Sequence, residues 1–384
     1  ITATDAYGYT CNITNTRNSF SFVYVAPIEV SNVTFSNGRS DALLTKNDTA
    51  TVSFSVNRSD VQIDGSAAIG SSSAGFSQSG RNFTARTSVT GATGDTIRAD
   101  LSGITITDDY GYSATVASPE TTYSYVAPLS SVPISVTSSN AAGNLAKNGD
   151  TVSISFTLPR AARVKEASIA GQSVSLSSDD SKTFTGNLQI TGGTDGEMIP
   201  VRVVLADSIP NNDDLTLIGP DAVRYVAPIR IVAAEFVSSN AKNAEYAKNG
   251  DLLTLSVTGN HDLIVNTCTI EGEAVQASGT TTVTATKAVS GKDDQSKIGY
   301  TISVSDAAGN EAVSITAAPI TYYAPIRVAG LTFKSSNANN SVMKDGDAAV
   351  LTFSTNHEVA VSGTVAENEV SANGQNIEFT QTVS

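Results

Sequence analysis

The sequence Tyr24-Val25-Ala26-Pro27-Ile28 occurs in closely similar form three more times along this chain of 384 residues. The later copies are Tyr125-Val126-Ala127-Pro128-Leu129, Tyr225-Val226-Ala227-Pro228-Ile229 and Tyr323-Ala324-Pro325-Ile326. Their prolines are 101, 100 and 97 residues apart. Self-similarity at a fixed period indicates an array of repeated structural units. A period near 100 residues is long enough for each unit to bury its own core.

Each copy is followed by the same two turn signals. A Ser/Asn turn comes first, at Ser36-Asn37, Ser138-Ser139-Asn140, Ser238-Ser239-Asn240 and Ser335-Ser336-Asn337. A tight turn comes next, at Lys46-Asn47-Asp48, Lys147-Asn148-Gly149-Asp150, Lys248-Asn249-Gly250-Asp251 and Lys344-Asp345-Gly346-Asp347. Asn-Gly and Asp-Gly adopt the positive φ angles of hairpin turns at little cost. We therefore expect a strand directly after each tight turn.

The residues after each tight turn alternate between apolar and Ser/Thr side chains. The apolar positions are Val52, Phe54 and Val56; Val152, Ile154 and Phe156; Leu253, Leu255 and Val257; and Ala349, Leu351 and Phe353. Side chains two residues apart in a strand lie on the same face of a sheet. One apolar face and one hydroxyl face are typical of a strand in a two-layer sandwich whose outer side meets water.

A further strand marker lies late in each unit and ends in an aspartate. It reads Ile104-Thr105-Ile106-Thr107-Asp108, Val203-Val204-Leu205-Ala206-Asp207 and Ile302-Ser303-Val304-Ser305-Asp306, and the chain begins with a match to it, Ile1-Thr2-Ala3-Thr4-Asp5. In the third unit a turn follows at Asp306–Asn310, whereas the second unit carries a local insertion, Ser208–Asp214.

These patterns predict an all-β protein made of tandem Ig-like β-sandwich domains in a rod-like array. Trp is absent, so the Cys…Trp…Cys core of antibody domains is missing. The YxAPI, AKNGDTVxxSF and SDAAGN elements resemble the tandem bacterial Ig-like repeats of extracellular adhesins and surface fibres. The resemblance covers essentially the whole chain and implies architecture more than any one activity.

The period divides the chain into five segments. Three whole repeats are expected, at residues 25–125, 126–225 and 226–323. Residues 324–384 are an incomplete fourth repeat that lacks its last strands, and residues 1–24 are the terminal strands of a unit whose start is absent. Two interpretations follow. The sequence is a window from a longer array, or residues 1–24 are donor strands that complete the fourth repeat of another subunit, which would build a filament.

The repeated linker predicts stiff joints between the units. It contains no Gly or Ser, and proline fixes φ while the residue before it stays extended. The expected joint residues are Tyr24, Pro27, Tyr125, Pro128, Tyr225, Pro228, Tyr323 and Pro325. Each tyrosine ring either packs between neighbouring domains or belongs to the core of its own domain.

Composition narrows the classes of function. The formal net charge of −14 disfavours nucleic acid as a partner, and no apolar run in this stretch is long enough to span a membrane. The expected partners are copies of the same chain, head to tail, or flanking repeats. Cys11 and Cys268 fall in different units, so we expect two isolated thiols, with a bridge between subunits as the alternative.

The sequence offers no catalytic constellation, and we expect no enzyme and no cofactor. The histidines, His261 and His357, follow the first core strand of their units, where the earlier units have Arg58 and Arg160. A position at which imidazole and guanidinium interchange is interpreted as a polar turn rather than a general base. Calcium is the one candidate ion, with oxygen ligands in Asn211–Asp214 and Asp108-Asp109.

The predicted function is structural. We expect a segment of an extracellular or cell-surface fibre, stalk or appendage, with strand donation as a candidate route of assembly. The alternative is an adhesin module that binds carbohydrate or a host protein through its loops. Sequons for N-glycosylation stand at Asn12, Asn32, Asn47, Asn57, Asn82 and Asn339.

Overall fold

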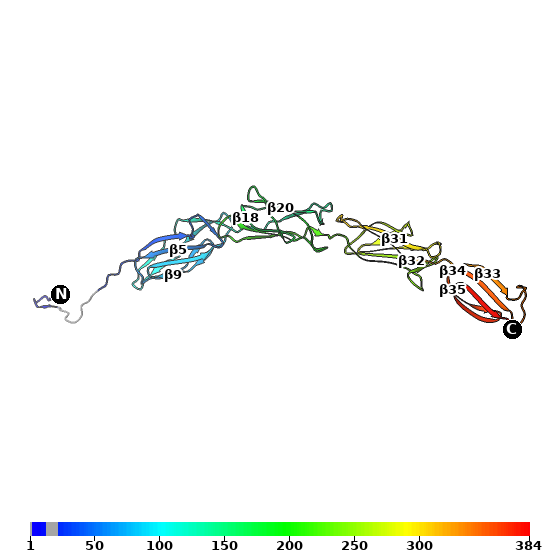
Figure 1. Cartoon of the computed structure of the whole chain (residues 1–384). Coiled ribbons are helices and arrows are strands. Elements are labelled where there is room, and N and C mark those ends of the chain that lie inside the picture. The colour runs from blue at the N-terminus through cyan, green and yellow to red at the C-terminus, as the bar shows by residue number, and fades with distance from the viewer. Residues whose placement is uncertain (1, 13–21) are drawn as a thin grey trace.

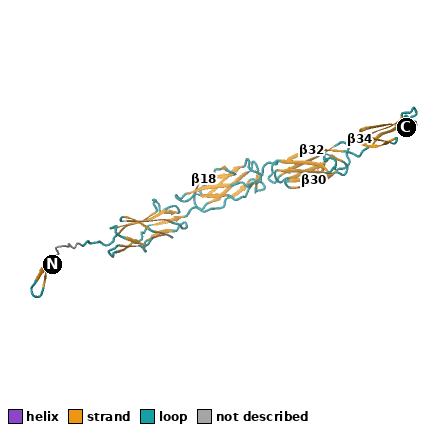
Figure 2. Ribbon diagram, turned by 90° about the horizontal axis from the view of Figure 1, so that it is seen from below, coloured by secondary structure: helices purple, strands orange, loops and turns teal. Residues whose placement is uncertain are grey.

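The computed structural model describes residues 2–12 and 22–384. Every secondary-structure element assigned in these residues is a β-strand, as Figure 2 shows. The strands form four groups, named units 1 to 4 in chain order, and Figure 1 shows them as a long, gently bent row with the two termini at opposite ends. Ile1 and residues 13–21, which belong to the predicted donor strands, lie outside the described residues.

Unit 1 is a sandwich of two main sheets. Its strands are β3 (Val30–Ser36), β4 (Leu43–Thr45), β5 (Thr49–Val56), β6 (Gln62–Asp64), β7 (Ala67–Ile69), β8 (Ser72–Ala74), β9 (Phe76–Ser79), β10 (Asn82–Ser88), β11 (Thr96–Asp100), β12 (Thr105–Thr107), β13 (Ser113–Thr115) and β14 (Thr122–Val126). The sheets have the orders β3-β5-β10-β9 and β4-β14-β11-β7-β8, with a third, small sheet β13-β12-β6. One buried cluster contains residues from both main sheets, including Phe54, Phe83 and Ile97.

Unit 2 repeats this plan with a reduced first sheet. Its strands are β15 (Ser135–Ser138), β16 (Leu145–Ala146), β17 (Thr151–Thr157), β18 (Ala162–Ile169), β19 (Gln172–Ser173), β20 (Thr183–Gln189), β21 (Val201–Asp207), β22 (Leu215–Ile218) and β23 (Arg224–Tyr225). They form the sheets β15-β17-β20, β16-β23 and β19-β18-β21-β22.

Unit 3 shows the Ig-like order most clearly. Its strands are β24 (Ile231–Ser238), β25 (Tyr246–Ala247), β26 (Leu252–Gly259), β27 (Ile264–Ile270), β28 (Glu273–Ala274), β29 (Ala277–Gly279), β30 (Thr282–Ala288), β31 (Lys297–Ser305) and β32 (Val313–Tyr322). If β24, β26, β27, β29, β30, β31 and β32 are taken as strands A to G, the sheets are ABED and GFC. That is the arrangement of an immunoglobulin constant-type sandwich. The predicted fold class is therefore confirmed.

Unit 4 consists of a single antiparallel sheet. Its strands are β33 (Val328–Ser335), β34 (Ala348–Val365) and β35 (Asn368–Thr382), in the order β33-β34-β35. Its buried apolar cluster is small, with Ala349, Val365, Ile377 and Phe379. At the other end of the chain, β1 (Thr2–Thr4) and β2 (Thr10–Asn12) form a separate hairpin.

The predicted alternation is present in the strands that follow the tight turns. In β5, β17 and β26 every apolar position named above is buried, and the Ser/Thr positions between them are half-buried. In unit 4 Ala349 is buried, whereas Leu351 and Phe353 are only half-buried against the smaller cluster. Unit 4 is a single sheet with β34 in its middle, and no second sheet packs on that strand among the described residues, which accounts for the difference.

One aspartate joins the two turn signals in units 2, 3 and 4, whereas in unit 1 the Asn37 amide donates to Asp41 and to the Leu43 carbonyl oxygen instead. In unit 3 the Asp251 carboxylate accepts hydrogen bonds from the Lys248 backbone N–H at 2.9 Å and from the Asn240 side-chain amide at 2.8 Å. Asp150 and Asp347 do the same in units 2 and 4. In these three units the Ser/Asn turn and the tight turn therefore form one part-buried polar network, which explains why both recur together.

We predict that Asp251→Ala destabilises unit 3 by roughly 1–3 kcal/mol, because the Lys248 N–H and the half-buried Asn240 amide lose their shared acceptor. Hydrogen exchange of the unit 3 amides measures the free energy of opening. Glu235→Ala, at an exposed carboxylate of the same unit, serves as the control and should change this free energy by no more than about 0.5 kcal/mol. Equal effects of the two substitutions would contradict the assigned role of Asp251.

Candidate functional site at the joints between units

Each linker is tied back to the unit that precedes it. The N–H of the alanine before the proline donates a hydrogen bond to a side-chain oxygen on the loop before the sixth sandwich strand. The pairs are Ala127 N to Thr93 Oγ1 at 3.1 Å, Ala227 N to Asp195 Oδ1 at 2.8 Å and Ala324 N to Asp294 Oδ1 at 2.8 Å. This bond restricts the rotation of the alanine, and the φ angle of the following proline is already fixed by its ring.

The linker tyrosines belong to the cores of the preceding units. Tyr125 and Tyr225 are buried, and the Tyr225 hydroxyl donates to Asn148 Oδ1 at 2.7 Å. In unit 3 the equivalent position is Tyr322, not Tyr323, because Tyr322 pairs with Ala247 as Tyr225 pairs with Ala146. Tyr323 lies one residue further on, at the joint. Tyr24 is exposed.

The position shared by Arg58, Arg160, His261 and His357 is a contact point at the N-terminal end of each unit. Arg160 forms an ion pair with Asp207 of its own unit, and the same guanidinium donates to the Ala127 carbonyl oxygen of the linker at 2.5 Å. Arg58 pairs in the same way with Asp108 and donates to the Ala26 carbonyl oxygen at 3.0 Å. The side chains of both aspartates are fully buried.

His261 links two units at the joint between units 2 and 3. Its Nδ1 lies 2.9 Å from Oδ2 of Asp195 in unit 2, and its Nε2 lies 3.1 Å from Oδ2 of Asp306 in unit 3. The Asn310 side-chain amide donates to the Ala227 carbonyl oxygen at 2.9 Å, beside this bridge. The residues Asp195, His261 and Asp306 line a cavity of about 320 Å³ between the two units. The predicted polar turn is thus a cross-domain bridge.

His357 takes the same place at the joint between units 3 and 4. Its Nδ1 lies 2.9 Å from Oδ2 of Asp294 in unit 3, and its ring meets the Tyr323 ring edge-on with 5.5 Å between centroids. The neighbouring Asn356 amide donates to Asp294 at 2.9 Å. Unit 4 has no counterpart of Asp306 among its described residues, so His357 bonds a single carboxylate.

The insertion in unit 2 docks on the tight turn of unit 1. Lys46 Nζ and Asn47 Nδ2 both lie 2.7 Å from the carboxylate oxygens of Asp213. Asn211 Nδ2 donates to Asp48 Oδ1 at 2.6 Å. The loop that interrupts the repeat pattern therefore adds charged contacts to this joint. At the joint between units 2 and 3 the shorter turn of unit 3 makes one contact of this kind, in which the Asn140 amide donates to the Ala308 carbonyl oxygen at 2.9 Å.

Ionic contacts hold the joint carboxylates in their charged form. Burial alone would raise the pKa of Asp195, but hydrogen bonds from the Ala227 N–H and His261 outweigh it and lower that pKa. The pKa of Asp294 is lowered in the same way by His357 and the Ala324 N–H, against the effect of burial. The Lys46 and Asn47 side chains lower the pKa of the exposed Asp213.

Three of the candidate calcium ligands form ion pairs with side chains of the protein. Asp108 pairs with Arg58, Asp213 with Lys46, and Asp214 with Lys165 at 2.5 Å. Within residues 2–12 and 22–384 no group of three or more His, Cys, Asp or Glu side chains is arranged to hold a metal ion. Cys11 is exposed and Cys268 is buried, and both are free thiols. Burial raises the pKa of the Cys268 thiol.

The sequons differ in how accessible their amides are. Asn12, Asn32, Asn82 and Asn339 are exposed. The Asn47 amide is bonded to Asp213 of unit 2, and the half-buried Asn57 amide donates to the Pro27 carbonyl oxygen at 2.9 Å.

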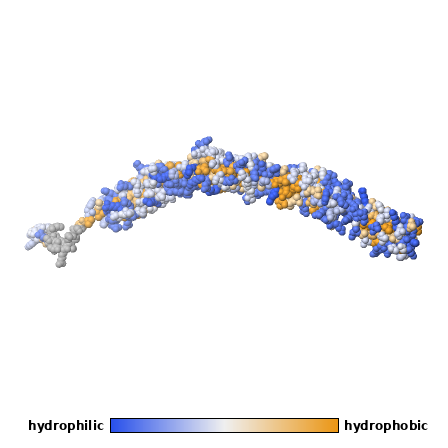
Figure 3. Space-filling model, viewed as in Figure 1, coloured by the Kyte–Doolittle hydropathy of each residue, from blue (hydrophilic) through white to orange (hydrophobic). Residues whose placement is uncertain are grey.

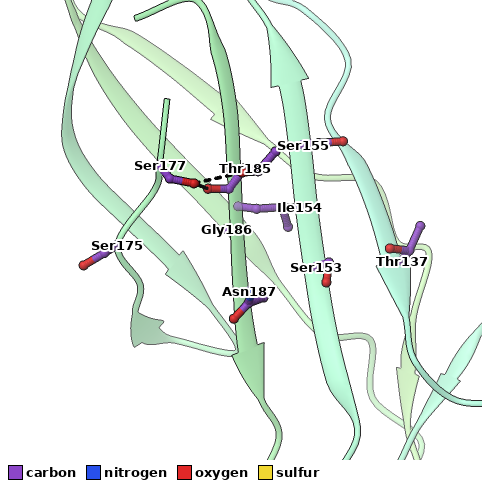
Figure 4. A pocket seen from close by; sticks show the side chains of 9 residues that line it. All are labelled: Thr137, Ser153, Ile154, Ser155, Ser175, Ser177, Thr185, Gly186 and Asn187. Carbon is purple, nitrogen blue, oxygen red and sulfur yellow. Dashed lines mark hydrogen bonds between the residues drawn. The ribbon is translucent and has the colours of Figure 1, made fainter. Parts of the chain in front are cut away.

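A shallow groove of about 280 Å³ crosses the first sheet of unit 2, and Figure 4 shows its lining of hydroxyl and amide side chains. Units 1 and 3 carry a fourth strand at this sheet, whereas unit 2 has only an isolated bridge between Ser177 and Thr185. A Cβ at Gly186 would lie 2.4 Å from Leu176 Cδ2, so this glycine leaves room for the Leu176 side chain. No aromatic ring lines the groove.

The hairpin of residues 2–12 copies a hairpin of unit 1. The pairs Thr2↔Asn12 and Thr4↔Thr10 correspond to Thr105↔Thr115 and Thr107↔Ser113 in β12 and β13. In both hairpins the aspartate that begins the turn accepts the same two backbone N–H groups. Asp5 Oδ1 accepts from Tyr7 and Tyr9 at 2.9 and 3.0 Å, and Asp108 Oδ1 accepts from Tyr110 and Tyr112 at 2.8 and 2.9 Å.

Comparison with solved structures finds matches at low identity and low TM-score. The full ectodomain (Ig1–Ig3) of mouse nectin-like molecule 4 matches at 14% identity and a TM-score of 0.32, over 74% of this chain and 97% of that one. A Ca²⁺-stabilised adhesin that helps an Antarctic bacterium bind ice matches at 14% identity and a TM-score of 0.32, over 93% and 90%. A marsupial T cell receptor matches at 10% identity and a TM-score of 0.31, over 76% and 100%. No protein-family model and no curated protein matches the sequence.

Sequence reasoning missed the partners of the histidines and the role of Asp195 and Asp294. A signal for this position was present in the sequence, since every repeat has an arginine or a histidine there. The partners of the two histidines, however, come from loops of the preceding unit about 65 residues earlier in the sequence. The aspartate on these loops is not repeated in unit 1, which has Thr93 at the equivalent place.

We predict that Arg160→Met lowers the free energy of unfolding of unit 2 by roughly 2–3 kcal/mol, because the buried Asp207 carboxylate loses its partner. Hydrogen exchange of the unit 2 amides measures this change. Lys165→Met, which removes an exposed ion pair with Asp214, should cost less than about 1 kcal/mol. A smaller loss for Arg160→Met than for Lys165→Met would contradict the buried pair.

Proposed function

We propose that this chain is a structural segment of an extracellular or cell-surface fibre, stalk or appendage. The observation that carries the proposal is that all three joints between units 1 and 4 are closed by hydrogen bonds and ion pairs that cross from one unit to the next. A tandem array with closed joints sets the reach of whatever it carries and resists bending. Figure 3 shows that the visible surface is a mixture of polar and apolar residues along the row.

The surface of the chain is consistent with this location and role. No helix in the described residues is long and apolar enough to cross a membrane. The negative net charge of −14 keeps such rods apart except where their ends meet. We include in the proposal N-linked glycans at Asn12, Asn32, Asn82 and Asn339, whose side chains are exposed, and exclude Asn47 while its amide stays bonded across the joint.

We predict that the purified chain is a row of four units by negative-stain electron microscopy and that a calcium chelator leaves its shape unchanged. The reason is that the carboxylates at the joints are already bound by the side chains of Arg160, His261 and His357. A chain purified with calcium and imaged before and after chelation provides the comparison. A row that becomes flexible on chelation would overturn the proposed origin of stiffness.

The second part of the proposal is assembly by strand donation. Phe35 of unit 1 is 4% exposed and meets the Tyr123 ring at 5.1 Å, whereas its equivalent in unit 4, Phe333, is 58% exposed. Counted back from the linker proline, the equivalent of Tyr123 in the N-terminal segment is Phe22, which is 93% exposed. We propose that residues 2–12 and 22–25 of one copy cover the open face of unit 4 in the next copy, with Phe22 on Phe333.

We predict that the full chain forms threads on concentration and that a variant lacking residues 1–25 does not, because the unpaired face of unit 4 then has no occupant. Electron microscopy shows threads, and sedimentation measures the mass. Phe22→Lys is a matched variant that keeps the hairpin and should lose most of the thread formation. A full chain that stays monomeric at high concentration would remove strand donation and leave the structural role in place.

The alternative function, an adhesin module, is favoured by one feature. The hydroxyl-lined groove of unit 2 could bind a polar ligand such as a carbohydrate (Figure 4). A glycan array with the full chain, compared with a Ser153→Val variant at the groove, distinguishes this function from the structural one.

A further inference from the structure

We propose that His261 and His357 make the joints between units 2 and 3 and between units 3 and 4 sensitive to pH, so that this half of the row stiffens on mild acidification. The joint between units 1 and 2 has Arg160 at the same position and does not respond to mild acidification. The inference rests on the joint contacts and does not depend on strand donation.

The geometry at His261 requires two donors. Its two ring nitrogens face carboxylate oxygens of Asp195 and Asp306, which belong to different units. An ionised carboxylate only accepts hydrogen bonds, and a neutral imidazole carries a single N–H. A neutral ring therefore bonds one carboxylate and points a lone pair at the other, whereas a protonated ring donates to both and joins the units.

The surroundings of His261 keep both carboxylates facing the ring. Asp195 also accepts hydrogen bonds from the Ala227 N–H and the Asn260 amide, and Asp306 accepts two from Asn310. The other charged side chains around the intervening cavity are those of Asp262 and Arg224. The side chain of His261 is 17% exposed and that of Asp306 is 2% exposed, so water cannot fully replace the missing hydrogen bond.

His357 has a weaker version of the same arrangement. The groups that face its ring are the Asp294 carboxylate and the Tyr323 ring, and Asn356 bonds the same carboxylate. A neutral ring with its proton on Nδ1 still donates to Asp294. Protonation therefore strengthens this joint without creating it, and the response should be smaller than at His261.

The sign of the effect follows from the two kinds of group. Imidazole is the side chain that gains a proton on mild acidification, and only the protonated ring has a donor for each of the two carboxylates, so acid favours the docked joint. At the acid end the limit is set by the carboxylates, and the lowered pKa of Asp195 keeps it ionised below its usual range. Arg160 stays charged throughout, and its linker contact is with a carbonyl oxygen.

The test measures distance distributions between spin labels on the full chain in a Cys11→Ser background, which leaves only the buried Cys268. Labels at Ser175→Cys and Thr280→Cys report the joint between units 2 and 3, and labels at Ser79→Cys and Ser175→Cys report the joint between units 1 and 2; all three positions are exposed. Samples at about pH 5.5 and about pH 8 are compared at constant ionic strength.

We expect the population of the undocked joint between units 2 and 3 to rise about tenfold from the lower to the higher pH, as the loss of one charged hydrogen bond implies, while the other pair of labels shows no change. His261→Arg should keep the undocked population low at both pH values, and His261→Gln should give the same, higher undocked population at both. A distribution for units 2 and 3 that is unchanged with pH overturns the proposal. So does an equal broadening at both joints, or a pH response that persists in His261→Gln.

Discussion

The ends of the units are organised around a buried carboxylate that must keep a charged or hydrogen-bonding partner. Asp108, Asp207 and Asp306 lie at the ends of equivalent strands or directly after them, and their side chains are almost fully buried. Removing such a group from water is costly unless a cation or several donors compensate it. Arg58, Arg160 and His261 supply that partner from the loop after the first core strand, and this places their polar ends beside the incoming linker. The joint is thus a by-product of satisfying a charge inside one unit.

Most of the sandwich could be predicted from sequence because its causes are local. The alternation in β5, β17 and β26 fixes which face is buried, and the paired turn signals fix where these strands begin. The hydrogen bonds of Asp251 to both turns were not foreseen, although the residues that make them had been identified as recurring. A repeated residue type shows that a position matters, but it does not show which neighbour it touches.

The joints could not be predicted, because their contacts join loops whose relation depends on how one sandwich follows another. His261 was interpreted as a polar turn on the sound ground that arginine replaces it elsewhere. The same replacement now has a physical explanation. The loop of the preceding unit that lies at the joint carries Thr93 where the next unit has Arg160, and it carries an aspartate where the next unit has a histidine. The acidic insertion of unit 2 was likewise considered as a cation site. It binds Lys46 and Asn47 of unit 1, which lie more than 160 residues away in sequence.

The three joints differ in kind. The first has the docked insertion and a permanently charged arginine, the second a histidine between two carboxylates, and the third a histidine with one carboxylate and an aromatic contact. Because the units are connected in series, a pull along the row acts with the same force on every joint. Extension under load therefore starts where the fewest bonds must break, between units 3 and 4, and the end of the row that carries unit 1 keeps its shape longest.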